Sequence, residues 1–461
     1  MFTREIYQRR RSVLADRLGG GLVLLPGNGE SPMNYVDNPY PFRQDSTFLY
    51  YLGIDQPELV AILDVDSGTT TIFGDELTLD HIVWMGDLPT VAAQAERVGV
   101  TQVQPRSELE GRVAAARSAG REIRFLPPYR SDAVILLANL LGLPPGQVPG
   151  EASLDLIRGV VEQRSLKSDE EIAEIDKAVA ASVAMHEAAI RLARPGSSER
   201  AVAAKVERIA MEAGGRIAFP VIATIHGQTL HNHVHPNRLS EGDLFLLDAG
   251  AETAFGYAGD LTTTFPVSAN FDERQKQIHQ ILMRAYAAAV AAVAPGVPYR
   301  TVHFTAARVI FDGMKDLGIM RGDSDEALAA GAHAIVFPHG LGHMMGLDVH
   351  DMESLGEDHV GYAGEPRSTQ FGLKSLRLAR PLEPGFVITV EPGIYFIPQL
   401  IDAWRSRAHC AEYIDFDELN RWRDFGGVRN EEDYLLTVDG ARRLGPRKPQ
   451  TIEDFRALRD S

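Results

Sequence analysis

Cysteine is almost absent: Cys410 is the one cysteine among 461 residues. A single thiol forms no disulfide within the chain and cannot build a thiolate cluster for zinc or iron–sulfur. This scarcity is typical of proteins kept in a reducing compartment. We therefore expect a cytoplasmic protein in which Cys410 is a passive thiol.

Basic residues and long apolar runs are also scarce. The chain has 46 Lys and Arg against 63 Asp and Glu, which gives a formal net charge of −17 at pH 7. Such a surface repels phosphate groups, so we expect neither nucleic acid nor a membrane as a partner. The longest apolar run, AVILLANLLGL at 133–143, is too short to cross a bilayer, and the N-terminal arginines precede no apolar segment of the signal-peptide kind.

The first 160 residues alternate between strand-like and helix-like segments. GLVLLPG and ELVAILDVDSGTTTIFGDE have the composition of strands, the second with a turn at Ser67 and Gly68. LPTVAAQAERVG and ELEGRVAAARSAG are typical of short helices that end at glycine. The pattern predicts an α/β domain over residues 1–160, without a catalytic cluster of its own.

A second domain with an α+β composition is predicted over residues 165–461. It begins with a capping box at Ser168 and Glu171, followed by apolar residues at helical spacing. GDLFLLDAG at 242–250 and GFVITVEPG at 385–393 share a frame in which five mostly apolar residues lie between a glycine and an acid. This internal similarity predicts two related halves. Further helices are expected at about 198–213, 272–293 and 300–317.

Four acids stand at or next to predicted strands of this domain. Asp248 ends GDLFLLD, and Glu391 ends GFVITVE. Asp260 is predicted on the strand of GDLTTTF, and Glu431 beside the strand of EDYLLT. Burial of a carboxylate must be compensated by arginine, by backbone donors or by a metal ion, and for a single acid a capped turn is sufficient. Four acids together with His343 form a hard-ligand set with one imidazole, which suits Mn²⁺, Co²⁺, Fe²⁺ or Zn²⁺.

The stretch PHGLGHMMGLDVHD at 338–351 contains three histidines. His339 and His343 have the i, i+4 spacing of the helical zinc proteases. That class requires glutamate where this chain has Gly340, and the glycines of the stretch disfavour a helix. A serine hydrolase is disfavoured as well, because the chain has no G-x-S-x-G sequence.

Together these motifs resemble the pita-bread metallopeptidases, in particular the proline-directed branch of aminopeptidase P and prolidase. HGLGHMMGLDVHD, TVEPGIYF and FGGVRNEED are similar to that branch. YPFRQDSTFLYYLG at 40–53 is similar to the non-catalytic N-terminal domain of those enzymes, so the resemblance covers nearly the whole chain. It implies the pita-bread fold, with pseudo-twofold halves, for the second domain.

The resemblance also implies a centre of two divalent metal ions, with Mn²⁺ first and Co²⁺, Zn²⁺ or Fe²⁺ as alternatives. Glu391 would both bind metal and carry the proton of attacking water to the leaving proline nitrogen. The implied ligands are a bridging pair, Asp260 and Glu431, with His343 and Glu391 completing one site and Asp248 the other. The implied surroundings are His231, His339 and His350 in the substrate pocket, with Thr262 and Arg429 supporting the ligands.

The implied activity is hydrolysis of Xaa-Pro bonds in small peptides. GLKSLRLARPLEPG resembles prolidase and places Arg377 where an arginine fork holds the free carboxylate of a dipeptide, so a dipeptidase is favoured. One alternative is an aminopeptidase P that accepts longer peptides. Another is a metal-free pita-bread domain that binds proteins, which retention of all five ligands disfavours. A homo-oligomer is expected by the same resemblance.

The chain departs from this family pattern in three places. Asp248 and Asp260 are separated by one residue more than usual, which the composition of ETAFGYAG assigns to a hairpin loop. Asn430 replaces the usual apolar residue, on the strand face opposite its two neighbours. The pair of methionines at 344–345 replaces bulkier residues. None of these changes removes a ligand.

Overall fold

The computed structural model describes residues 2–460, which form two compact units. The first unit comprises Met1–Arg164 and Met352–His359, and the second comprises Ser165–Asp351 and Val360–Ser461. The domain ranges 1–160 and 165–461 stay a prediction from the sequence. The structure groups the short segment Met352–His359 with the first unit.

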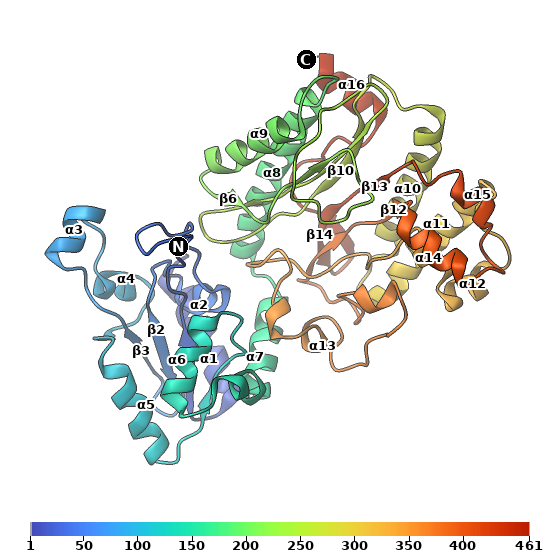
Figure 1. Cartoon of the computed structure of the whole chain (residues 1–461). Coiled ribbons are helices and arrows are strands. Elements are labelled where there is room, and N and C mark those ends of the chain that lie inside the picture. The colour runs from blue at the N-terminus through green and yellow to red at the C-terminus, as the bar shows by residue number, and fades with distance from the viewer. Residues whose placement is uncertain (1, 461) are drawn as a thin grey trace. The chain divides into compact units, whose positions relative to one another are not determined.

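The first unit is built on a five-stranded sheet with the order β4-β3-β2-β1-β5 (Figure 1). The inner pairs β1–β2 and β2–β3 are antiparallel, and the outer pairs β3–β4 and β1–β5 are parallel. The turn between β2 and β3 contains Ser67 and Gly68, and Gly68 has a φ of 68°. The strands are β1 (Leu22–Pro26), β2 (Val60–Asp64), β3 (Thr69–Phe73), β4 (Gln102–Gln104) and β5 (Ile123–Arg124).

Helices pack on this sheet through apolar side chains. Leu24, Ile62 and Phe73 of the sheet share one buried core cluster with Val113 of α5 and Leu137 of α6. The helices of this part of the chain are α1 (Arg4–Leu18), α2 (Ser46–Leu52), α3 (Leu79–Met85), α4 (Val91–Arg97), α5 (Glu108–Ser118), α6 (Ser131–Leu141), the 3-10 helix η1 (Pro145–Glu151) and α7 (Leu154–Ser165), with η3 (Glu353–Leu355) and α13 (Glu357–Val360) later in the chain.

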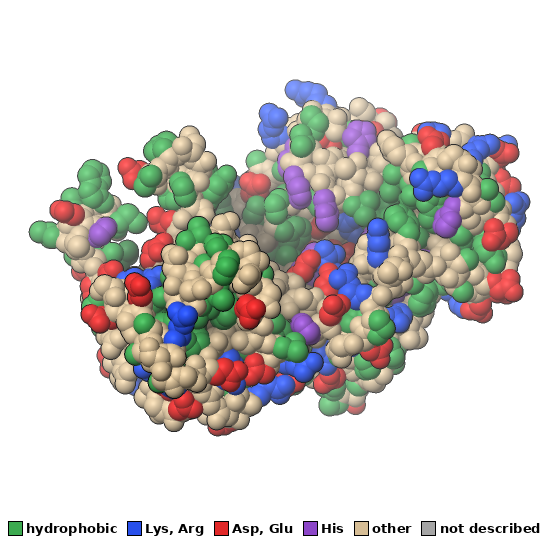
Figure 2. Space-filling model, turned by 60° about the horizontal axis from the view of Figure 1, so that its bottom comes forward, with side chains coloured by type: hydrophobic (Ala, Val, Ile, Leu, Met, Phe, Trp, Pro, Cys, Tyr) green, Lys and Arg blue, Asp and Glu red, His purple; other side chains and the backbone are tan. Residues whose placement is uncertain are grey.

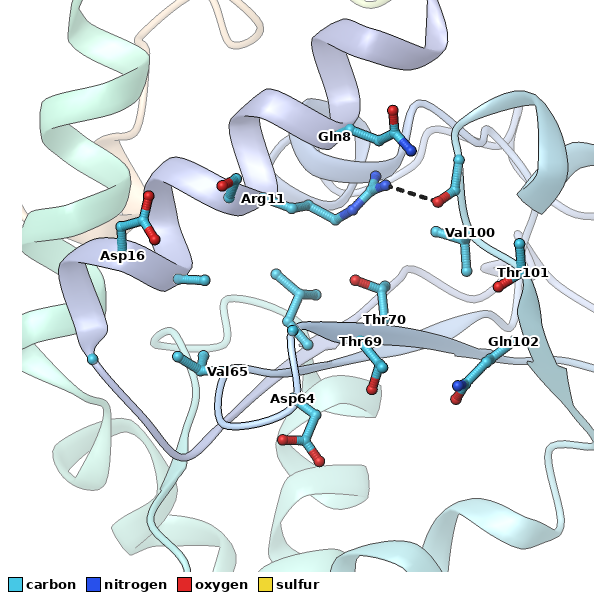
Figure 3. A pocket seen from close by; sticks show the side chains of 16 residues that line it. Gln8, Arg11, Asp16, Asp64, Val65, Thr69, Thr70, Val100, Thr101 and Gln102 are labelled. Atoms are coloured by element: carbon cyan, nitrogen blue, oxygen red, sulfur yellow. Dashed lines mark hydrogen bonds between the residues drawn. The ribbon is translucent and has the colours of Figure 1, made fainter.

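A cavity of about 630 Å³ lies in the first unit beside α1, the β2–β3 hairpin and the start of β4 (Figure 3). Its buried polar groups are used by the fold. Arg11 donates to the backbone carbonyls of Tyr51 and Val98 at 2.9 and 2.8 Å, and Asp64 pairs with Arg121 at 2.6 Å. This cavity therefore holds structural ion pairs and carbonyl contacts, and its lining shows no arrangement of acid, base and nucleophile.

No single helix among residues 2–460 is long and apolar enough to span a membrane, although α6 and η1, bent by 89°, pass together on length and composition. On the face shown in Figure 2, basic side chains lie among acidic ones and form no extended basic surface.

The second unit contains two similar halves, each with a helix pair and a three-stranded antiparallel sheet. Helices α8 and α9 belong with the sheet β10-β8-β7, and α10 and α11 with the sheet β11-β14-β15. The turn that joins each helix pair has a glycine at positive φ, 91° at Gly196 and 81° at Gly296. The predicted fold class, an α/β domain followed by an α+β domain with related halves, is confirmed.

The bounds of these elements follow the sequence pattern closely. Ser168 precedes α8, and its N–H donates to Glu171 at 3.1 Å as the capping box requires. The helices are α8 (Asp169–Leu192), α9 (Glu199–Glu212), α10 (Glu273–Ala292), α11 (Tyr299–Asp316), α12 (Ser324–Ala330), η2 (Ala332–Ile335), η4 (Leu373–Ser375), α14 (Pro398–Ser406), α15 (Phe416–Asn420) and α16 (Ile452–Asp460). The strands are β6 (Arg216–Ile217), β7 (Ile222–Thr224), β8 (Leu244–Asp248), β9 (Ala251–Glu252), β10 (Thr262–Pro266), β11 (Val387–Val390), β12 (Gly393–Tyr395), β13 (Gly427–Arg429), β14 (Glu432–Thr437) and β15 (Gly440–Arg443).

Candidate metal centre

Two acids come from the first half of the second unit. Asp248 is the last residue of the buried strand β8 and is paired in register with Thr262, the first residue of β10. Asp260 was predicted on a strand, but it lies two residues before β10. The reason is that its backbone N–H donates to the carboxylate of Asp433 at 2.9 Å, so this residue leaves the strand ladder.

Glu391 and His343 come from the second half. Glu391 directly follows β11, and its N–H donates to the carbonyl of Leu341 at 2.8 Å. His343 lies in the glycine-rich stretch, which forms loops and turns instead of a helix. A Cβ on Gly342 would lie 2.2 Å from the carbonyl oxygen of Thr389, so only glycine lets this loop approach β11.

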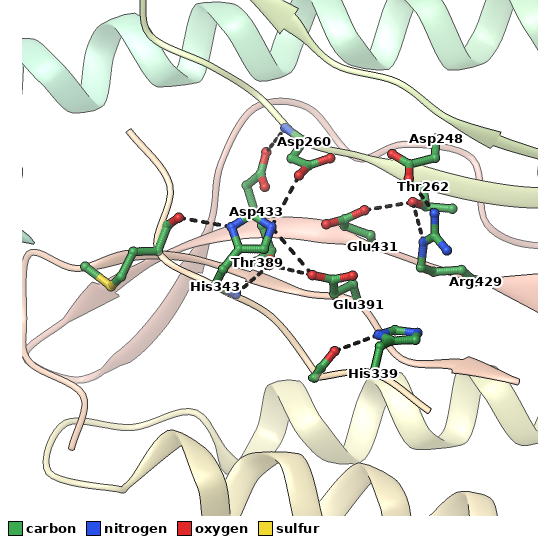
Figure 4. Close-up of polar contacts among 12 residues, drawn as sticks. Asp248, Asp260, Thr262, His339, His343, Thr389, Glu391, Arg429, Glu431 and Asp433 are labelled. Atoms are coloured by element: carbon green, nitrogen blue, oxygen red, sulfur yellow. Dashed lines mark hydrogen bonds and ion pairs between the residues drawn. The ribbon is translucent and has the colours of Figure 1, made fainter. Parts of the chain in front are cut away.

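The tautomer of His343 follows from its hydrogen bonds. The ring Nδ1 lies 3.0 Å from the carbonyl oxygen of Met344, which can only accept, so Nδ1 carries the proton. In the neutral ring Nε2 then presents a lone pair, and it faces Asp260 Oδ2 at 3.4 Å and Glu391 Oε1 at 3.5 Å (Figure 4). An imidazole held by its other nitrogen against a backbone carbonyl is the usual arrangement of a metal-binding histidine.

Glu431 joins the two halves. It lies between β13 and β14 and forms an isolated bridge with Thr262, whose carbonyl accepts the Glu431 N–H at 3.0 Å. The Thr262 hydroxyl donates to Glu431 Oε2 at 2.7 Å, which fixes the carboxylate as well as the backbone. Asp260, His343 and Glu431 each offer one ligand atom, and these three atoms lie within 4.8 Å of one another.

Arg429 is buried and contacts Asp248 and Thr262 directly. Its guanidinium pairs with Asp248 and also donates to the Thr262 hydroxyl at 3.1 Å and to the Tyr395 hydroxyl at 2.9 Å. Arg429 thereby holds one acid and, through Thr262, orients Glu431. Figure 4 shows the guanidinium on the Asp248 side of the cluster and His343 on the opposite side.

The electrostatics show that the carboxylates are undercompensated by protein groups alone. Burial, with repulsion from Asp248, raises the pKa of Asp260 to about 8. Burial raises the pKa of Glu391 to about 7, and burial and the neighbouring acids raise the pKa of Glu431 well above its usual range. Among residues 2–460, the buried Oδ1 atoms of Asp248 and Asp260 have no hydrogen-bond partner. Unpartnered buried carboxylate oxygens beside a histidine lone pair fit a divalent cation.

Comparison with known proteins decides the family. The model of metallopeptidase family M24 matches residues 173–438, and the model of the aminopeptidase P N-terminal domain matches residues 7–123. The chain belongs to metallopeptidase family M24. Membership of this family implies divalent metal ions.

Relatives of this M24 metallopeptidase carry two names. Human Xaa-Pro dipeptidase is 30% identical over 478 residues, with 98% of this chain and 92% of the relative covered. Escherichia coli Xaa-Pro aminopeptidase is 31% identical over 468 residues, covering 98% of this chain and 97% of the relative. A solved structure of zinc-substituted E. coli aminopeptidase P with product covers 100% of this chain and 99% of its own, with a TM-score of 0.82 and 28% identity. The resemblance inferred from the motifs is confirmed.

Of the residues expected in the substrate pocket, His350 lies against His343, and His231 and His339 share an electrostatic environment with Arg377. The rings of His350 and His343 have centroids 4.1 Å apart. Burial lowers the pKa of His339 to about 3, and the pKa of His231 is also lowered, first by burial. The positive charge of Arg377 contributes to lowering both pKa values, so Arg377 is close enough to His231 and His339 to act on them electrostatically.

His339 is engaged through both ring nitrogens. Nδ1 lies 2.7 Å from the carbonyl oxygen of Gly340 and so carries the proton, while Nε2 lies 3.0 Å from the Tyr395 hydroxyl. Because the same hydroxyl accepts from Arg429, its own proton points to His339. In this arrangement His339 has no N–H left to donate to a substrate.

Asp433 and Tyr395 were missed at the sequence level. Asp433 is fully buried and binds the backbone of Asp260, and burial raises its pKa well above the usual range. Its signal was present, because Asp433 of β14 follows Glu431 by two residues in extended chain, so the two side chains point to the same face. Tyr395 had no local signal, since its hydroxyl is defined by partners 34 and 56 residues away.

Proposed function

We propose that this chain hydrolyses Xaa-Pro peptide bonds with two divalent metal ions, preferentially Mn²⁺, and that dipeptides are its favoured substrates. The observation that carries the proposal is the buried cluster of carboxylates around the His343 lone pair. Its oxygen-rich donor set suits Mn²⁺, and Co²⁺, Zn²⁺ or Fe²⁺ are the alternatives.

Five residues would hold the two ions. Asp260 and Glu431 would be shared, because both halves of the unit meet at their carboxylates and both are close to His343. His343 and Glu391 would complete one site, and Asp248, held by Arg429, the other. When bound, the ions act as Lewis acids that make hydroxide available near neutral pH.

Glu391 would move the proton. Its Oε1 lies 3.5 Å from Nε2 of His343, among the proposed ligands, where a carboxylate can accept a proton from water and release it again. In the proposed reaction it takes a proton from the attacking water and delivers it to the proline nitrogen. His350 and the pair His339–Tyr395 would line the pocket, with Tyr395 and Arg429 fixing the orientation of the His339 ring.

Arg377 would select the length of the substrate. A guanidinium whose charge acts on both His339 and His231 can hold the carboxylate at the end of a dipeptide by paired hydrogen bonds. Longer peptides carry a neutral amide at that point and lose this ion pair. The second candidate function is that of an aminopeptidase P acting on longer peptides, which is favoured by the name of the E. coli relative.

The decisive experiment compares two substrates on the chelator-stripped protein after addition of Mn²⁺. Hydrolysis of Ala-Pro in preference to Ala-Pro-Ala supports the dipeptidase, and the opposite preference supports the aminopeptidase. Binding of Mn²⁺ without cleavage of either peptide rejects the Xaa-Pro activity. If no metal binds, the metal-free protein-binding domain is the better hypothesis.

Two arginine variants make the test specific. Arg377→Met should raise KM for Ala-Pro by about 10–100-fold, the value of a charge-assisted pair, with a smaller effect on Ala-Pro-Ala. Arg380→Met is the matched control, because Arg380 is close in the chain but pairs with Glu383 at 2.6 Å. Equal effects of both variants would contradict the role of Arg377.

Assembly and location complete the proposal. A homo-oligomer is expected, and light scattering of the purified full chain measures it. A cytoplasmic location is supported by the single cysteine.

A further inference from the structure

A second buried polar cluster lies behind the strands that carry the acids. Strand alternation separates the two clusters: the Thr262 hydroxyl faces Glu431, while the Thr263 hydroxyl faces away and meets Lys448 and His186. Lys448 is fully buried, although it comes from the C-terminal segment of the chain, after β15. A buried ammonium group is costly, so its contacts require an explanation.

The three N–H groups of Lys448 meet three acceptors. Nζ lies 2.8 Å from the carbonyl oxygen of Thr262, 3.2 Å from the hydroxyl of Thr263 and 2.7 Å from Oδ1 of Asn430. The Thr262 carbonyl is the same group that accepts the backbone N–H of Glu431. Lys448 and the backbone of Glu431 therefore donate to the same carbonyl, and Lys448 stabilises the bridge between Thr262 and Glu431.

The cluster continues through His186 to the residue that follows Asp248. The Nε2 of His186 lies 3.1 Å from the carbonyl oxygen of Ala249, and Nδ1 lies 2.9 Å from the Thr263 hydroxyl. A carbonyl only accepts, so Nε2 donates, Nδ1 accepts from Thr263, and the Thr263 oxygen is left to accept from Lys448. Burial lowers the pKa of His186 to about 3, which agrees with the neutral ring that this order requires.

This directed chain of hydrogen bonds touches three ligand-bearing segments. Asn430 precedes Glu431, Thr262 follows Asp260 by two residues, and Ala249 follows Asp248. We propose that Lys448 is a positioning residue of the metal centre, which holds these three segments in register from the face opposite the metal ligands. The inference rests on the proposed metal site.

Asn430, which stands where the family pattern has an apolar residue, supplies one of the three acceptors of Lys448. An apolar residue at this position would leave one ammonium N–H without an acceptor, and Asn430 supplies that acceptor. Within residues 2–460 the Nδ2 of Asn430 has no hydrogen-bond partner. The side chain of Asn430 is thus buried with only its oxygen bonded, and the hydrogen bond from Lys448 explains why a polar residue stands at this position.

A purely electrostatic role for Lys448 predicts the opposite effect on metal binding. A cation near the centre repels a divalent ion, so removing the charge alone should tighten binding. If Lys448 instead positions the ligands, removing it should weaken binding, because outer contacts of metal ligands typically contribute 10–100-fold to affinity. The sign of the change therefore separates the two explanations.

The test measures Mn²⁺ binding to the chelator-stripped full chain, from the electron paramagnetic resonance signal of the unbound ion. Lys448→Met should weaken binding about tenfold, the lower end of that range, because Lys448 acts one contact further out. Arg447→Met is the matched control: it removes a cation from the same segment, where Arg447 pairs with Asp454 at the surface, and should leave Mn²⁺ affinity unchanged. Unchanged or tighter binding by Lys448→Met overturns the proposal.

Loss of stability must be separated from loss of positioning. Val206→Ala opens a cavity in the buried core of the same unit, far in sequence from the network, and should lower Tm without changing Mn²⁺ affinity. Asn430→Leu keeps the test possible if Lys448→Met does not fold, and should weaken binding by a few fold. Equal affinity of Asn430→Leu and the unmodified chain would then contradict the inference.

The double variant Asn430→Leu/Lys448→Met tests whether stability and Mn²⁺ affinity are lost separately. Replacing both partners by apolar groups should recover much of the Tm lost in Lys448→Met, while Mn²⁺ binding stays weak. Recovery of affinity together with Tm would show that Lys448 only stabilises the fold. Absence of Mn²⁺ binding by the unmodified chain would reject the proposed metal site itself, which is a different result.

Discussion

In the metal-free protein, the free energy of unfolding should fall as the pH rises above 6.5. Four buried carboxyls are perturbed: the pKa of Asp260 is about 8 and that of Glu391 about 7, and the pKa values of Glu431 and Asp433 are raised well above the usual range. All four carboxyls have ordinary pKa values of about 4 in the unfolded chain. Burial and mutual repulsion raise their folded values, so the folded metal-free protein keeps protons that the unfolded chain has already released.

The sign and size of the effect follow from this difference. A folded state that binds more protons loses stability with rising pH, and each excess proton contributes about 1.4 kcal/mol per pH unit. Near pH 7 Asp260 and Glu391 alone hold between one and two excess protons, so the free energy of unfolding should fall by at least about 2 kcal/mol per pH unit, and Glu431 and Asp433 add to this slope. For a unit of this size, a fall of about 2 kcal/mol corresponds to a decrease in Tm of roughly 3 °C per pH unit.

Buried histidines fix the lower limit of the pH window. Burial lowers the pKa of His186 to about 3 and those of His279 and His333 to about 4. Their unfolded values are about 6.5, so the unfolded chain takes up protons below that pH and the folded state loses stability as pH falls. The two effects have opposite signs, and the metal-free protein should be most stable near pH 6.5.

Thermal unfolding in chelator between pH 6.5 and 8.5 measures this slope. Saturating Mn²⁺ should raise Tm more at pH 8 than at pH 6.5, because metal binding requires deprotonated ligands. The double variant Asp260→Asn/Glu391→Gln is the control and should lose the share of the slope, about 2 kcal/mol per pH unit, that these two carboxyls contribute. A Tm of the unmodified metal-free chain that is constant or rises across this range would refute the reasoning.

The acids of the centre could be predicted because each has a local signal. Asp248 and Glu391 end apolar strands, and the frame GDLFLLDAG and GFVITVEPG repeats between the halves. The glycines around His343 excluded a helix, and the structure shows loops there. Strand periodicity and glycine geometry act over a few residues, so one sequence is enough to detect them.

The residue pattern alone could not predict the supporting contacts, because their partners are distant in the chain: Arg429 and Asp248 are 181 residues apart, and Lys448 and Thr262 are 186 apart. The family resemblance gave Arg429 as support for a ligand, and the structure pairs it with Asp248. Nothing local in the sequence marks Lys448 as buried, since an isolated lysine is usually exposed. The same cause explains the error at Asp260, whose backbone is drawn from the strand by the carboxylate of Asp433, 173 residues away.

Three further predictions concern buried side chains of the second unit. Arg429→Met leaves a buried carboxylate without its cation and should cost the metal-free protein ~3–5 kcal/mol in urea unfolding, a loss that Mn²⁺ partly restores by supplying positive charge. Lys167→Met breaks the buried pair with Asp351, 2.9 Å long, at a similar cost of ~3–5 kcal/mol, which Mn²⁺ should not restore. Tyr395→Phe removes the hydroxyl that accepts from Arg429 and donates to His339; it leaves one buried donor of Arg429 and the acceptor Nε2 of His339 unpaired and should cost ~1–3 kcal/mol in stability. If that hydroxyl orients the His339 ring toward the substrate, kcat for Ala-Pro should fall about tenfold while KM and Mn²⁺ affinity change little; an unchanged kcat, with the expected loss of stability, would show that the hydroxyl serves the fold alone.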